Sequence, residues 1–214
     1  MAGRHNPAAD HRGSRKAYRK LNSLTQTPAA PAPSAGPGPA GPGYDPDSTE
    51  PQPPGSLAAL IARILTEIDA LQFESFSKDD ALDLGLLLVE LGRARALPIA
   101  IDIRKAGQVL FHAALEGATP DNELWIRAKQ RTAARYEVPY LLVGLRARAA
   151  GGRIEDNAWF NQKRYAAHGG AFPIYVRGTG AVATVTVSGL PQKADHELVV
   201  EALAAFLGRA GTLG

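Results

Sequence analysis

The chain has 214 residues, no cysteine and a formal net charge of +3. Without cysteine it has no disulfides, no thiolate metal sites and no cysteine nucleophile. Residues 1–55 hold six Lys or Arg residues and four acidic residues, so the rest of the chain is nearly neutral. A nearly neutral domain with a short basic end lacks the charge pattern of a nucleic-acid-binding protein, and we expect no such partner.

No membrane-spanning or secretory segment is expected. The chain has no apolar run of about eighteen or more residues, the length that indicates a transmembrane helix. Its basic N-terminus is not followed by the apolar segment of a secretory signal. We therefore expect a soluble, cytoplasmic protein without a membrane partner.

The chain divides into a tail, residues 1–55, and one globular domain, residues 56–210. Eleven of the sixteen prolines precede Ser56, among many Ala and Gly residues. Such a composition buries too little apolar area to offset the cost of chain ordering, so we expect the tail to be disordered. The basic stretch Arg12–Leu21 is either a weak anionic-surface binder or a solvated end, and the tail could also be a start-site extension.

Two helices are expected to open the domain. Leu57, Leu60, Ile61 and Ile64 begin an apolar series at helical spacing, with Ser56 as its N-cap. Ser77 and Asp80 form a capping pattern ahead of a second helix. This second helix is apolar nearly all round, so we expect it to lie between a sheet and another helix or subunit.

A β-hairpin and two further helices follow. The segment PIAIDIR alternates apolar with other residues, and the largely apolar segment QVLFHAA follows it after a short turn. Two strands joined by so short a connection must be antiparallel. Thr119–Asn122 is a helix-start sequence, and we expect the helix to face inward with Leu124, Trp125, Ala128 and Thr132. Another helix is expected after Pro139, ending at Gly151–Gly152.

The last part of the chain predicts a second hairpin and a final helix. FPIYVRG and AVATVTVSG are strands joined by Gly178–Thr179–Gly180, and Leu198 to Phe206 carry the apolar stripe of the helix. Hairpins alternating with helices predict an α+β sandwich around an antiparallel sheet.

One candidate ligand site is the turn Ser188–Gln192, which joins a strand end to a helix start. Free backbone amides at such a place, including that of Gly189, can hold a carboxylate or phosphate, and Lys193 adds a positive charge. The alternative is a turn that only reverses the chain. Trp125 and Lys129 share one helix face and are candidates for the pocket wall, although packing explains them equally.

His168, Asp195 and His196 are the other candidates for chemistry. Adjacent side chains on a helix diverge by about 100°, so Asp195 and His196 do not readily bind one ion, and we expect no metal site. Asp195 alternatively stabilises a helix start, and His168 alternatively makes only loop hydrogen bonds. His112 lies in a strand and is expected on a sheet face.

Three segments together resemble the haem-degrading-domain family of the PduO/GlcC-like superfamily, and most nearly a branch of uncharacterised proteins. They are PLPIAIDIRKAGQVLFHAALEGATPDNELWIRAK, AAHGGAFPIYV and TVTVSGLPQKADHELVV. The resemblance runs from Leu57 to Gly208 and implies a profilin-like α+β sandwich. It also implies a homo-oligomer and a small-molecule ligand such as haem, but it transfers no shared ligand set or catalytic motif.

Three functional hypotheses remain. The first is a small-molecule-binding protein for haem or a related tetrapyrrole, with ligand residues His168, Ser188, Gly189, Gln192, Lys193, His196 and Trp125. The second is an enzyme that degrades haem, or acts on another small molecule, with His168 and Asp195 as acid and base. The third is an oligomeric accessory protein without a ligand.

Overall fold

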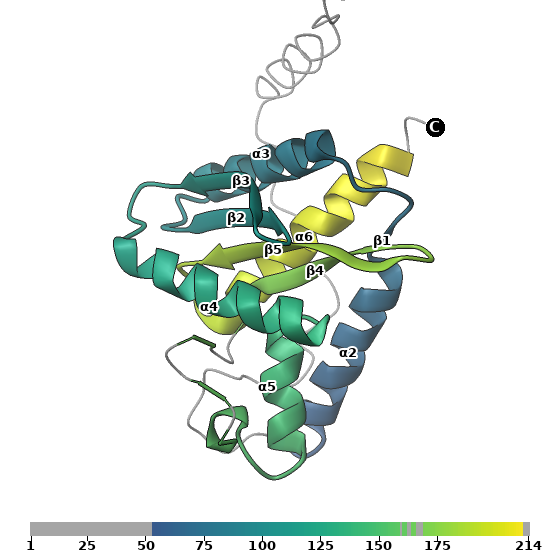
Figure 1. The fold of residues 1–214 in the computed structure, drawn as a ribbon, viewed down its shortest axis with the longest axis vertical. Helices are drawn as coiled ribbons and strands as arrows, with labels where there is room; N and C mark the ends of the chain where they lie inside the picture. The colour runs from purple at the N-terminus through teal and green to yellow at the C-terminus, as the bar shows by residue number, and fades with distance from the viewer. Residues whose placement is uncertain (1–52, 159, 162–163, 166–168, 212–214) are drawn as a thin grey trace, which may run out of the picture. The chain divides into compact units, whose positions relative to one another are not determined.

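A five-stranded sheet with helices on both faces forms the described part of the chain (Figure 1). The computed structural model describes residues 53–158, 160–161, 164–165 and 169–211, which all belong to one compact unit. The expected tail lies almost entirely outside the described residues, so its disorder and its boundary at residue 55 stay predictions. No helix among the described residues is long and apolar enough to cross a membrane.

The elements follow the order expected from the sequence. The helices are α2 (Ser56–Ala70), α3 (Lys78–Ala94), α4 (Pro120–Tyr136), α5 (Tyr140–Ala149) and α6 (Gln192–Gly211), with a short 3-10 turn η1 (Ile154–Asp156). The strands are β1 (Gln72–Phe73), β2 (Ala100–Lys105), β3 (Gln108–Ala114), β4 (Ala171–Val176) and β5 (Gly180–Ser188). The expected α+β sandwich is confirmed.

Both predicted hairpins are present, and the sheet has the order β1-β4-β5-β2-β3. The hairpins β2–β3 and β4–β5 meet through antiparallel pairing of β2 with β5. The two-residue strand β1 pairs in parallel with β4, which the expectation of a wholly antiparallel sheet did not include. Strand β3 is therefore the longer of the two edges.

The two faces of the sheet differ in polarity. On one face Ile101, Ile103 and Val185 are fully buried in the main apolar core, against α3 and α6. On the other face Asp102 lies opposite Thr186 in the strand register, and both are fully buried on the side that α4 covers. The polar face decides which side of α4 turns inward.

The inward face of α4 differs from the expectation. Leu124 and Trp125 are 63% and 40% exposed, whereas Ile126, Lys129, Thr132 and Ala133 are buried. Thr132 was assigned correctly, but Leu124 and Trp125 were assigned wrongly. The reason is that α4 packs on the polar face of the sheet, which accepts Lys129 and Thr132 where an apolar core would have selected Leu and Trp.

The helix starts were predicted with mixed success. Ser77 caps α3 with its hydroxyl on the Asp80 amide, and the Asp80 carboxylate accepts the Ser77 amide, as predicted. Ser56 is not the N-cap of α2, because Gly55 takes that position with a φ of 77°. The Ser56 hydroxyl instead donates to the Pro53 carbonyl.

Replacing the two serines with alanine separates a cap from a first-turn residue. Ser77→Ala removes the acceptor for the Asp80 amide, and we expect the free energy of unfolding to fall by about 1 kcal/mol. Ser56→Ala is the matched control and should lower the free energy of unfolding by only a few tenths of the loss in Ser77→Ala, since no α2 amide depends on the Ser56 side chain. Urea unfolding followed by circular dichroism measures both, and equal losses would contradict the assignment.

Candidate functional site

The first turn of α6 sends two neighbouring polar side chains in different directions. Asp195 and His196 are both fully buried. Asp195 contacts Lys129 of α4 and the turn after β5, while His196 contacts Glu67 of α2. The divergence expected for adjacent helical residues is thus observed, and the two residues take part in different clusters.

Asp195 and Lys129 form a buried ion pair. The Lys129 Nζ atom lies 2.6 Å from Asp195 Oδ2 and also donates to the Val187 carbonyl at 3.1 Å. Burial raises the pKa of the Asp195 carboxyl to about 6, although Lys129 and the amides of Leu190 and Gly189 oppose the rise. A buried charge pair survives only with such additional hydrogen bonds, because desolvation of both ions is costly.

The amides of the Ser188–Gln192 turn already bind an anion that belongs to the protein. The Leu190 amide donates to Asp195 Oδ1 at 3.1 Å, and the Gly189 amide also bonds to this carboxylate. The sequence pattern therefore indicated anion-binding amides, and in the structure the Asp195 carboxylate occupies them. A ligand carboxylate would have to displace Asp195 from its contact with Lys129.

Glycines hold this turn close to its neighbours. A Cβ atom on Gly189, whose φ is 151°, would lie 2.2 Å from the Pro98 carbonyl oxygen. A Cβ atom on Gly169 would lie 1.6 Å from the Gln192 carbonyl oxygen, so the backbones touch there. These two glycines thus allow neighbouring segments to pack closely around the turn that holds Asp195.

The other predicted ligand residues lie at several places around this cluster. Ser188 is 3% exposed, and its carbonyl accepts from Asn122 of α4 at 3.3 Å. Gln192 is buried, and Lys193 lies 3.8 Å from Glu197 on the outside of α6. The exposed Trp125 donates its indole N–H to Asp121. His168 lies outside the described residues.

His196 belongs to a chain of polar groups that reaches the surface. Its Nε2 atom lies 2.8 Å from Glu67 Oε2, and its ring packs near Phe172 with a centroid distance of 6.0 Å. Its Nδ1 atom is buried with no hydrogen-bond partner among the described residues. The other Glu67 oxygen lies 3.3 Å from Arg63 Nε, so the half-exposed Arg63 ends the chain.

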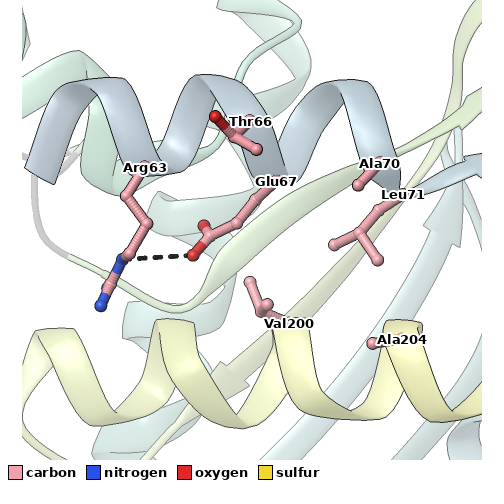
Figure 2. Close-up of a pocket in the computed structure, with 7 residues that line it drawn as sticks. All are labelled: Arg63, Thr66, Glu67, Ala70, Leu71, Val200 and Ala204. Atoms are coloured by element: carbon pink, nitrogen blue, oxygen red, sulfur yellow. Dashed lines mark ion pairs between the residues drawn. The ribbon is translucent and has the colours of Figure 1, made fainter.

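Glu67 also lines a groove between α2 and α6 (Figure 2). The groove has a volume of about 350 Å³. Ala70, Leu71 and Ala204 contribute apolar surface, and Arg63 and Glu67 lie together at one end. Its other lining residues are Thr66 and Val200. The groove therefore combines an apolar wall with one cation and one carboxylate.

A second polar cluster on the α4 side of the sheet was not identified from the sequence. The buried Asp102 accepts from Arg104 Nε at 2.7 Å and lies 3.1 Å from His112 Nδ1. His112 Nε2 lies 3.0 Å from Glu123 of α4. His112 is on a sheet face, as predicted. No pattern within its own strand indicates that Glu123 of α4 lies beside it. Neither this cluster nor any other group of His, Asp and Glu residues in the described part of the chain is arranged to hold a metal ion.

Comparison with known proteins finds one matching family model and several bacterial relatives. A family model described as haem-degrading protein, HbpS-like, matches residues 76–204. A UPF0303 protein of Streptomyces coelicolor is 52% identical over 151 residues, which cover 71% of this chain and 96% of that protein. A UPF0303 protein of Paraburkholderia phymatum is 50% identical over 152 residues, which cover 71% of this chain and 92% of that protein.

Solved structures show the same fold. The Ybr137w protein is 29% identical with a TM-score of 0.65, covering 72% of this chain and 94% of that one. The protein of the PduOC:heme complex is 18% identical with a TM-score of 0.53, and the match covers 61% of this chain and 94% of that one. At that identity the second similarity shows the fold alone.

Replacing Lys129 with methionine tests the buried ion pair. Lys129→Met leaves the Asp195 carboxylate buried without its cation, and we expect a loss of about 3 kcal/mol in the free energy of unfolding near pH 7. Because Lys129 lowers the pKa of Asp195, its removal raises that pKa further above 6. The folded variant then retains the Asp195 proton where the wild type has lost it, so the loss should grow from about pH 5.5 to about pH 8.

Denaturant unfolding across this pH range measures the effect. The matched control is Lys193→Met, which removes a partly exposed lysine and should change stability by less than about 0.5 kcal/mol. A Lys129→Met loss that is small, or that does not depend on pH, would contradict the pairing.

Proposed function

This chain belongs to the family of HbpS-like haem-degrading proteins, and from this membership we propose that it binds haem or a related tetrapyrrole. A protein of the same fold, PduOC, has been crystallised as a haem complex, which supports this class of ligand. The remaining question is where this chain offers a suitable surface.

The α2–α6 groove is the proposed binding place, and its lining carries the proposal. Ala70, Leu71, Val200 and Ala204 provide apolar contact for a ring face, and Arg63 can pair with a propionate. About 350 Å³ is at the small end of the usual 300–1,000 Å³ for ligand pockets, so the groove would hold part of a ring and leave an edge outside.

The groove is favoured over the Ser188–Lys193 turn for a specific reason. At that turn Asp195 already accepts the Leu190 amide, and Lys193 faces Glu197. By contrast, Arg63 is 44% exposed in its side chain, and its contacts at 3.3 and 3.4 Å are long. Among the predicted ligand residues that the structure describes, only His196 adjoins the groove, through its hydrogen bond to Glu67.

The residues fit a haem only in part. The described histidines near helices α2 and α4 both face carboxylates, because His196 Nε2 contacts Glu67 and His112 contacts Asp102 and Glu123. Neither presents an open imidazole to the groove. We therefore expect ring contacts and Arg63 to supply most of the affinity.

Substitutions in the groove test the proposal. Arg63→Ala should weaken haem binding about fivefold, the value of one exposed charge-assisted contact. Ala204→Phe should weaken it further, because its ring would occupy the apolar wall. The readout is the Soret band during titration with haem, and Arg95→Ala is the matched control, because Arg95 is equally exposed but pairs with Glu201 outside the groove.

Three results would count against the proposal in different ways. Wild-type protein that gives no Soret change would reject haem binding altogether. Binding that both groove variants leave intact would reject the groove. Weakening by Arg95→Ala equal to that by Arg63→Ala would reject a specific role for Arg63.

Haem breakdown is the second candidate, because the family model carries that description. The geometry does not favour Asp195 as its acid or base, since this carboxylate is fully buried and bound to Lys129. Adding a reductant to the haem complex separates the two activities. Loss of the Soret band with release of iron indicates breakdown, and a stable band indicates binding alone.

A further inference from the structure

Arg63, at the end of the groove, lies between two carboxylates, one from each of the helices that form the groove. On α2, its Nε atom lies 3.3 Å from Glu67 Oε1, the ion pair that is marked in Figure 2. On α6, its Nη2 atom lies 3.4 Å from Glu197 Oε1. The two distances are nearly equal, so the surroundings of each carboxylate decide how firmly it holds the arginine.

Glu67 is held from behind by a buried histidine. Its side chain is only 16% exposed, and its second oxygen, Oε2, lies 2.8 Å from His196 Nε2. His196 is fully buried, and its Nδ1 atom has no hydrogen-bond partner among the described residues. The proton of the ring therefore belongs on Nε2, which donates it to the carboxylate. Glu67 is thus fixed at both of its oxygens.

Glu197 is much more exposed. Its side chain is 49% exposed, and its Oε1 atom lies 3.4 Å from Arg63 Nη2 and 3.8 Å from Lys193 Nζ. Lys193 precedes it by four residues on the same side of α6, so the contact with Lys193 needs no change in the helix. Exposed ion pairs contribute little free energy and are screened by water. Glu197 can therefore leave Arg63 and remain beside Lys193.

We propose that the two carboxylates act on the groove in opposite ways. Glu67, fixed by His196, holds the Arg63 guanidinium for an anionic group of the ligand. Glu197 competes with that group for Nη2. A guanidinium has five N–H donors in one plane, so it can bind Glu67 through Nε and a ligand carboxylate through its terminal nitrogens at the same time. When the ligand carboxylate binds, Glu197 moves to Lys193 and Glu67 stays in place.

The local charges give the competition its direction. Arg63 and Lys193 are two cations, and Glu67 and Glu197 are two carboxylates, so an incoming anion meets no net charge. Removing the charge of Glu197 leaves one positive charge in excess, which attracts a carboxylate. Glu197 therefore controls the affinity for anionic ligands, although it does not line the groove. This role rests on the proposed function, because the anion is a carboxylate of the bound tetrapyrrole.

Glu197→Gln tests the competition, because glutamine keeps the shape and removes the charge. The dissociation constant for haem, measured from the Soret band, should fall about threefold. A carboxylate that only held α2 against α6 would give the opposite result, since a looser groove binds less tightly. Glu201→Gln is the matched control, because Glu201 is similarly exposed on α6 but pairs with Arg95 outside the groove. An unchanged or larger constant in Glu197→Gln, or an equal fall in Glu201→Gln, would overturn the competition.

Haem dimethyl ester shows whether the gain depends on the carboxylates of the ligand. Both of its propionates are esterified, so it offers the same ring without an anion. Glu197→Gln should bind the ester no more tightly than the wild type does. An equal gain with the ester and with haem would overturn the proposal, because the charge of Glu197 would then act on something other than the anion.

The positioning role of His196 is tested in the protein without a ligand. His196→Leu keeps a similar volume but removes the donor to Glu67, whereas His196→Gln retains a donor. The Arg63 Nε–H gives its own nitrogen-15 NMR signal, and its exchange with solvent should be about threefold faster in His196→Leu than in the wild type. His196→Gln should exchange at the wild-type rate. Equal rates in all three proteins would overturn the positioning role.

This measurement does not depend on haem. A wild-type protein without a Soret change would reject the proposed function, while exchange at Arg63 would still report on the arrangement of Glu67 and His196. Glu67→Ala, at a partly exposed position, removes the acceptor for Arg63 Nε and should also speed the exchange, so the test does not require that His196→Leu folds. Unchanged exchange in Glu67→Ala would overturn the role of Glu67.

Discussion

The buried ion pair between Lys129 and Asp195 is the contact on which the rest of the arrangement depends. It joins the middle of α4 to the first turn of α6, and Lys129 also binds the Val187 carbonyl near the end of β5. Two amides of the following turn complete the shell of the carboxylate. Because both ions are almost fully removed from water, these partners must remain in place for the charges to be tolerated.

The position of Asp195 determines what its neighbour can do. With Asp195 directed at α4, His196 must leave α6 on another side, where it meets Glu67 of α2. That contact places a polar chain from His196 through Glu67 to Arg63 at the end of the apolar groove. The first turn of α6 therefore supplies both Asp195 of the interior ion pair and His196, which contacts Glu67 at the proposed ligand site.

The sequence predicts most of the fold but only part of the site. Hairpins and the Ser77 cap depend on residues within a few positions of each other, so local patterns reveal them. The Lys129–Asp195 pair joins residues far apart in the chain, and the sequence therefore indicated Lys129 only as a candidate for a pocket wall beside Trp125. Trp125 was misplaced because the face of the sheet that α4 covers is polar, which no pattern within α4 discloses. The groove likewise depends on how α2 meets α6.

The central claim is that a ligand binds beside α2 and α6, and not at the turn after β5. Hydrogen–deuterium exchange with and without bound haem tests this claim most directly, because it reports protection along the whole backbone. The account predicts added protection in Arg63–Leu71 and Glu197–Ala204, with little change in Ser188–Lys193. Protection centred on Ser188–Lys193, with none in α2, would contradict it.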